Sequence, residues 1–119
     1  MRILFLDDDG SRISKFKEAH IGQIVDVATT ADDAVAFLRK NEYDWISLDH
    51  DLLEHHYGRP CGHRDGCGYR VAEFIASRPR VFGDTPIEVH TLGEENGYAM
   101  VTLLRDAGVR RARRKPFRL

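Results

Sequence analysis

The feature that most constrains the fold is the segment 43–52, an apolar run that ends in two carboxylates on either side of an imidazole, Asp49, His50 and Asp51. A short apolar run between a helical pattern and a glycine-rich loop is typical of a central parallel strand that is buried on both faces. In open α/β sheets, functional sites form at the carboxyl ends of the strands. We therefore expect Asp49 and Asp51 to lie where such a fold has its chemistry.

A second acidic strand end comes earlier in the chain, where the apolar run 3–6 is followed by Asp7, Asp8 and Asp9. Three further strands are predicted at 23–28, 85–90 and 109–112. Helices are predicted at 11–20, at 31–38 after Thr30 as N-cap, at 69–77, and from Ala99 to Leu104 with Gly108 as the C′ residue. The sequence thus predicts one α/β domain over 1–119, a flavodoxin-like doubly wound parallel sheet of five strands in the order 2-1-3-4-5. It would have four helices, with the last helix of such folds absent.

The composition fits a globular protein, with 42% hydrophobic residues, 31% charged residues and a net charge of -1. The sequence contains no apolar run of about 20 residues and no signal-peptide pattern, so we expect a cytoplasmic protein. Cations are concentrated near the end, at Arg110, Arg111, Arg113, Arg114, Lys115 and Arg118. They are suited to an RNA backbone, but they equally balance a nearby acidic pocket.

Four strand ends resemble the signature segments of the receiver domains of two-component signalling, in the runs 2–9, 44–49, 86–91 and 115–117. The resemblance implies that Asp7 and Asp8 hold Mg²⁺ and that Asp49 accepts a phosphoryl group. It also implies that Thr91 senses this group and that Lys115 pairs with it, before a cis Pro116.

The runs 6–9, 47–52 and 89–91 are more similar to a receiver-like branch named for cyclic-phosphate processing, because ordinary receivers seldom carry His50 or His90 at these positions. Two features depart from ordinary receivers. The sequence ends at Leu119, so we expect the last receiver helix to be absent, and about a dozen extra residues lie between Leu52 and Gly68.

The residues alone support a metal site, since hard cations such as Mg²⁺ or Mn²⁺ prefer carboxylate oxygens. Asp7, Asp8 and Asp49, with Asp51 or its backbone, would supply the ligands. The alternative is that the first aspartates only cap the next helix and Asp49 only ends a strand.

Two histidines are candidates for acid-base chemistry, because an imidazole with a near-neutral pKa exchanges protons with water or with a leaving oxygen. These are His50 and His90, each with the alternative of a core role. Asn96, expected in the loop after Thr91, is a further candidate for a phosphate contact.

The segment 53–68 forms a second group of candidate ligands, His55, His56, Cys61, His63 and Cys67. We weigh a zinc site against a mobile lid in which Arg59 or Arg64 reaches a substrate phosphate. The two cysteines are expected to be reduced thiols or metal ligands.

Three functions follow from these observations. The first is an enzyme, an Mg²⁺-dependent phosphoesterase that processes a phosphate or cyclic-phosphate end of a nucleotide or RNA. The second is a stand-alone receiver, phosphorylated on Asp49 by a histidine kinase, that signals by binding a partner. The third is a binding module without turnover. Without a last helix, the apolar residues of strands three to five (Trp45, Ile46, Leu48, Ile87 and Val89) would be partly exposed, which predicts a homodimer.

Overall fold

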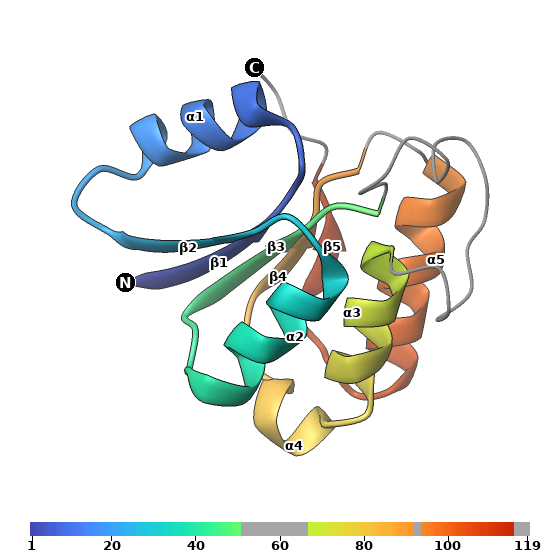
Figure 1. Cartoon of the computed structure of the whole chain (residues 1–119). Helices are drawn as coiled ribbons and strands as arrows, with labels where there is room; N and C mark the ends of the chain where they lie inside the picture. Colours follow the sequence, from blue (N-terminus) through green and yellow to red (C-terminus); the bar gives the residue numbers. More distant parts are fainter. Residues whose placement is uncertain (51–66, 92–93, 116–119) are drawn as a thin grey trace.

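The computed structural model describes residues 1–50, 67–91 and 94–115 and has a parallel five-stranded sheet at its centre (Figure 1). The strand order is β2-β1-β3-β4-β5, as predicted. The strands are β1 (Arg2–Leu6), β2 (Ile24–Ala28), β3 (Trp45–Leu48), β4 (Ile87–Val89) and β5 (Ala112–Arg114). Parallel pairing brings the carboxyl ends of β1, β3 and β4 to one edge of the sheet, with Leu6 beside Leu48 and Leu48 beside Val89.

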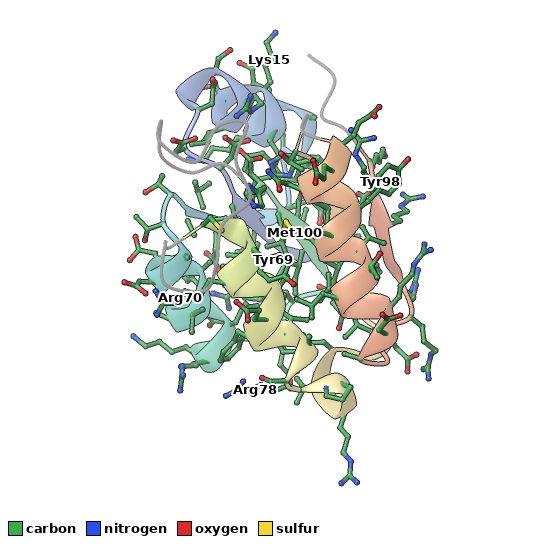
Figure 2. The ribbon with its side chains drawn as sticks, turned by 90° about the vertical axis from the view of Figure 1, so that its right-hand side faces the viewer. Lys15, Tyr69, Arg70, Arg78, Tyr98 and Met100 are labelled. Atoms are coloured by element: carbon green, nitrogen blue, oxygen red, sulfur yellow. The ribbon has the colours of Figure 1, made fainter. Side chains whose placement is uncertain are left out.

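The helices divide between the two faces of the sheet (Figure 1). Helix α1 (Gly10–Ala19) lies on one face, and α2 (Ala31–Lys40), α3 (Gly68–Ala76) and α5 (Glu94–Asp106) lie on the other. Figure 2 shows α3 and α5 side by side, with Met100 toward the inner layer and Tyr98 outside. None of the helices in the described part of the chain is long and apolar enough to cross a bilayer.

Strand alternation assigns the apolar side chains to these two faces. Leu4, Leu6, Ile46, Leu48, Ile87 and Val89 belong to the main core with α2, α3 and α5, whereas Ile3, Phe5 and Phe16 form a smaller core under α1. The expectation that Ile46, Leu48, Ile87 and Val89 are partly exposed is wrong, since all four are fully buried.

The α1 side of β3, β4 and β5 carries polar side chains in register, Ser47 beside Glu88 and Glu88 beside Arg113. Glu88 is buried and accepts two hydrogen bonds from Arg113, at 3.2 and 2.9 Å. The homodimer stays a prediction, but four of the five apolar residues that motivated it do not lie on this surface.

Several element boundaries differ from the predictions for local reasons. Helix α1 begins at Gly10, one residue before its predicted start, because the Asp9 side chain caps it: Oδ1 of Asp9 accepts the Arg12 backbone N–H at 3.0 Å. Thr30 caps α2 as predicted. A short helix that was not predicted, α4 (Pro79–Phe82), begins with Pro79 in the first-turn position that proline favours.

The last two elements are shifted along the chain from their predicted places. Helix α5 begins at Glu94, five residues before the predicted start at Ala99, because Glu94 and Glu95 are favourable in a first helical turn. Gly108 has the positive φ of 101° that the prediction required. Val109 after it is buried as part of the core connection, so β5 begins three residues later than predicted, at Ala112.

Candidate functional site

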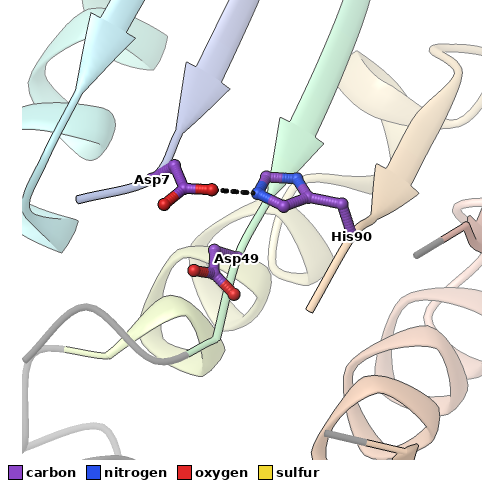
Figure 3. Close-up of side chains that lie close together, drawn as sticks. All are labelled: Asp7, Asp49 and His90. Atoms are coloured by element: carbon purple, nitrogen blue, oxygen red, sulfur yellow. Dashed lines mark hydrogen bonds and ion pairs between the residues drawn. The ribbon is translucent and has the colours of Figure 1, made fainter. Parts of the chain in front are cut away.

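Three side chains meet where β1, β3 and β4 end, Asp7, Asp49 and His90 (Figure 3). Each offers one ligand atom, and these atoms all lie within 4.8 Å of one another. Their relative exposures are 0%, 3% and 4%, so the cluster is shielded from water. The structure thereby joins the two predicted strand-end aspartates to one of the two candidate histidines.

Asp7 is the best-satisfied carboxylate of the cluster. It accepts the Asp9 backbone N–H at 2.9 Å, and its Oδ2 lies 2.9 Å from Nε2 of His90. Arg12 binds both of its oxygens. Burial by itself raises the pKa of Asp7, but the hydrogen bonds from His90 and Arg12 outweigh it and lower the pKa to about 2.

Arg12 connects Asp7 to Asp49 from the first turn of α1. Its Nε is 2.8 Å from Asp7 Oδ2, and its Nη2 is 3.0 Å from Asp7 Oδ1 and 3.4 Å from Asp49 Oδ2. The hydrogen bonds to Asp7 raise the pKa of Arg12, so the guanidinium stays charged. This cation was not among the predicted site residues.

Asp49 is less well compensated than Asp7. Its Oδ1 accepts the His50 backbone N–H at 2.8 Å, while its Oδ2 has the long contact to Arg12. Burial raises the pKa of Asp49 to about 6, because the charged form is costly away from water. The site therefore contains one carboxylate, Asp7, that is stabilised as an anion, and one, Asp49, whose charged form is destabilised by burial.

Helix α3 closes directly against the Asp49 backbone. The Gly68 N–H donates to the His50 carbonyl at 2.9 Å, and a Cβ on Gly68 would lie 1.7 Å from the Asp49 carbonyl oxygen. Only a residue without a side chain permits this approach. Gly68 thus fixes where the β3 end sits relative to α3.

His90 is held on three sides. Its Nδ1 lies 2.8 Å from the Ser47 hydroxyl, its Nε2 faces Asp7, and its ring stacks on Phe5 at 4.9 Å between centroids with 8° between the planes. Ser47 lies on the α1 side of β3, between Phe5 and Glu88 in the register. These contacts fix the orientation of the imidazole and give each ring nitrogen a defined hydrogen-bond partner.

Asp8 lies outside the group of close ligand atoms, but its state is informative. Its Oδ1 is buried and has no hydrogen-bond partner among the described residues. Burial and the neighbouring Asp7 charge raise the pKa of Asp8 above 3.8. A buried carboxylate oxygen without a partner is an unmet demand for a proton or a cation.

The other predicted site residues lie in different surroundings. His50 is buried with its Nε2 3.9 Å from Cys67 Sγ, so its ring is not part of the cluster. Thr91 is buried next to the cluster's His90 and close to Gly97 of α5. The Lys115 amine lies 3.7 Å from Glu88 Oε2. Asn96 is in the first turn of α5 and not in the predicted loop.

Cys67 is disulfide-bonded, so the expectation of a reduced thiol or a zinc thiolate is wrong at this residue. Zinc coordination by this loop has no support among the described residues, where the candidate metal group is Asp7, Asp49 and His90. Asp51 and Pro116 fall outside the described residues. So do the remaining candidate residues of the predicted loop, which are His55, His56, Arg59, Cys61, His63 and Arg64.

Sequence reasoning missed three residues of this region, Arg12, Ser47 and Glu88. The position of Arg12, three residues after the helix cap Asp9, was a usable signal, because that turn of α1 follows the β1 end directly. Ser47 and Glu88 interrupt otherwise apolar strands, and each pairs with a charged or ionisable side chain.

The fold and the acidic strand ends define the class of this protein as a receiver domain. A family model described as the cyclic-phosphate processing receiver domain matches residues 2–106. The chain belongs to this family, as the sequence motifs indicated. No curated protein matches the chain.

Solved receiver structures share the fold over nearly the whole chain. A two-component response regulator from Clostridium difficile is 22% identical to this chain, with a TM-score of 0.66. The match covers 99% of this chain and 85% of the response regulator. The non-phosphorylated HemR receiver domain from Leptospira biflexa is 25% identical, with a TM-score of 0.64 and coverages of 98% and 83%. A response regulator protein from Burkholderia multivorans is 26% identical, with a TM-score of 0.65 and coverages of 98% and 84%.

Proposed function

We propose that this receiver domain processes a phosphate or cyclic-phosphate end of a nucleotide or RNA, in a reaction that depends on Mg²⁺ or Mn²⁺. The observation that carries the proposal is the contact of His90 with Asp7 beside Asp49, because it puts an oriented imidazole in a buried acidic pocket. The family description supports the same substrate class.

The residues present fit a divalent cation. Asp8 has a buried oxygen without a partner in the described part of the chain, and Asp8 and Asp49 both have raised pKa values. Asp7, Asp8 and Asp49 would hold the ion, with Asp51 as the further predicted ligand. When bound, such an ion neutralises charge on the phosphoryl oxygens.

The protein's own residues handle the protons. Opening a 2′,3′-cyclic phosphate with water forms one P–O bond, breaks another, and moves a proton from the water to the leaving 2′ or 3′ oxygen. We assign this transfer to His90, because an imidazole both accepts and donates protons; its Nε2, bonded to Asp7 in the metal-free protein, would exchange that partner for the water or the leaving oxygen. Asp7 and Ser47 orient its ring by bonding Nε2 and Nδ1.

Turnover of a 2′,3′-cyclic nucleotide with Mg²⁺ or Mn²⁺ tests the proposal, with product release followed by chromatography. We expect hydrolysis by the wild type, and its loss in His90→Ala while the protein remains folded. His20→Ala is the matched control, because His20 is also an aromatic-stacked histidine but packs on Phe16, away from the cluster. Absence of turnover in the wild type with every cyclic nucleotide contradicts the proposal.

A second candidate is a signalling receiver phosphorylated on Asp49. The position of Asp49 after β3, on a fold shared with response regulators, favours it. A histidine kinase or a small phosphodonor would then be the partner. Acetyl phosphate separates the two functions: a stable adduct of one phosphoryl mass that is absent in Asp49→Asn favours signalling, whereas cyclic-phosphate turnover by an unmodified protein favours the enzyme.

The basic end of the chain favours a small substrate over a long RNA. Arg110 pairs with Asp84, and Arg113 pairs with Glu88. These two cations thus already have local partners, which supports the interpretation that the basic residues balance nearby acidic groups. We therefore assign RNA recognition to the terminal phosphate and not to extended backbone contacts.

A further inference from the structure

Arg12 lies between the two carboxylates that end β1 and β3. One guanidinium spans them, with two contacts of 2.8 and 3.0 Å to Asp7 and one of 3.4 Å to Asp49. Its backbone is fixed independently, because the Arg12 N–H donates to the helix cap Asp9. The side chain is 22% exposed, whereas that of Asp7 is fully buried, so Arg12 enters the pocket from its solvent side.

The position of Arg12 is that of a counter-ion. Two buried carboxylates in one pocket repel each other, and a positive charge between them relieves that repulsion. A divalent cation bound to both Asp7 and Asp49 would need the same oxygen atoms that Arg12 now uses. The Arg12 guanidinium and a divalent cation would therefore compete for the same position between Asp7 and Asp49.

We infer that Arg12 is an internal competitor of the divalent cation, which must displace the guanidinium from Asp7 and Asp49 in order to bind. The inference deepens the proposed function and rests on its metal site. Once displaced, the guanidinium stays next to the pocket through its fixed backbone. Its planar array of donors suits phosphate oxygens, so Arg12 then serves to position the substrate phosphate.

The competition has a measurable sign that distinguishes it from an ordinary ion pair. If Arg12 only stabilised the fold, its removal would leave metal affinity unchanged or lower it. If it competes, its removal raises the affinity, because the carboxylates no longer have to give up a partner. The same removal destabilises the metal-free protein, and added metal restores the loss.

Calorimetric titration of Mn²⁺ and Mg²⁺ into metal-free protein tests the inference without substrate. We expect Arg12→Gln to bind Mn²⁺ about tenfold more tightly than the wild type, or better. Arg12→Lys should lie between them, because it keeps the charge but loses the two-pronged contact. Arg2→Gln is the matched control, since Arg2 also binds a carboxylate through two nitrogens, at Asp26 on the edge strand β2, and should leave the affinity unchanged.

Side-chain NMR supplies a second readout that folding defects do not imitate. The Arg12 Nε–H, assigned by its loss in Arg12→Lys, should give a protected signal in the metal-free protein because it is bonded to Asp7. Saturating Mg²⁺, which is diamagnetic, should shift this signal and remove its protection. The Arg2 Nε–H signal should not change.

The outcomes separate the inference from the proposed function. Equal metal affinity in the wild type and Arg12→Gln, or an Arg12 signal that ignores Mg²⁺, overturns the inference and leaves the metal site intact. Tighter binding in Arg12→Gln without any cyclic-phosphate turnover supports the inference and contradicts the proposed function. Lack of metal binding by both proteins overturns both.

Discussion

Nε2 of His90 lies 2.9 Å from Oδ2 of Asp7, although 83 residues separate the two in the sequence. The contact exists because β1 and β4 both flank β3 and end at the same edge of the sheet. With Ser47 on the other ring nitrogen, the imidazole is bonded on both sides and buried. It is therefore a fixed part of the acidic pocket and not a mobile side chain.

Replacing His90 tests how much this fixation stabilises the protein. We expect His90→Asn to lower the free energy of unfolding by roughly 1–3 kcal/mol, because Asp7 and Ser47 each lose a buried partner. Urea denaturation at pH 7 with a chelator measures it. The control His20→Asn loses a bond to the Phe16 carbonyl at a half-buried position, so its cost should be smaller. Equal costs would contradict a special role for the buried contact.

Asp49 makes the stability of the metal-free protein depend on pH. Its pKa is raised from 3.8 to about 6, so the folded state binds more protons than the unfolded state between these values. Stability contributed by protonated Asp49 is thus lost as pH rises through this window, by up to about 3 kcal/mol. We expect Asp49→Asn to be more stable than the wild type above pH 6, with the difference vanishing near pH 4.

The pKa of Asp7 is shifted in the opposite direction, so its effect on stability has the opposite pH dependence and serves as the comparison. Its pKa is lowered to about 2, so its contribution is present above pH 4 and is lost as pH falls toward 2. Asp7→Asn should be less stable than the wild type at pH 7 and similar to it near pH 2. Chemical denaturation from pH 2 to 8 with a chelator measures both curves, and parallel curves for the two variants would contradict the assignment.

The sequence was sufficient to predict the sheet order and the positions of Asp7 and Asp49, because both follow from apolar runs that end in charge. It did not predict the ion pairs. Whether Arg12 turns toward Asp7, or Lys115 toward Glu88, depends on the packing of α1 and β5 and leaves no periodic pattern in the chain. The start of α5 was missed for a similar reason, because a glycine such as Gly97 lowers the helix propensity of this segment. In the structure Gly97 is a buried helical residue against Thr91 and Arg114.

Gly68 tests how closely the site depends on α3. A Cβ at this position would lie 1.7 Å from the Asp49 carbonyl oxygen, which is backbone and cannot move aside cheaply. We expect Gly68→Ala to lose about 2 kcal/mol or more of stability and to displace the Asp49 end of β3. Gly10→Ala is the control, because a Cβ there meets no atom of the described residues within 4 Å and alanine favours the helix. Thermal unfolding that places both variants together would contradict this close packing.

Asp8 and Asp9 offer the sharpest test of the metal site, because they are adjacent in the sequence but have different structural roles. Oδ1 of Asp8 is buried and has no partner within 1–50, 67–91 and 94–115, whereas Oδ1 of Asp9 caps α1 through the Arg12 N–H. We expect Asp8→Asn to weaken Mn²⁺ binding by about tenfold or more, as loss of a metal contact does. Without metal the same variant should be as stable as the wild type or more so, because the raised pKa shows that the fold disfavours the Asp8 charge. Asp9→Asn should keep the affinity, because asparagine caps a helix as well as aspartate. Calorimetric titration and urea denaturation of the two variants decide the matter: an Asp8→Asn protein with unchanged affinity would remove Asp8 from the metal site and leave its buried oxygen without a function.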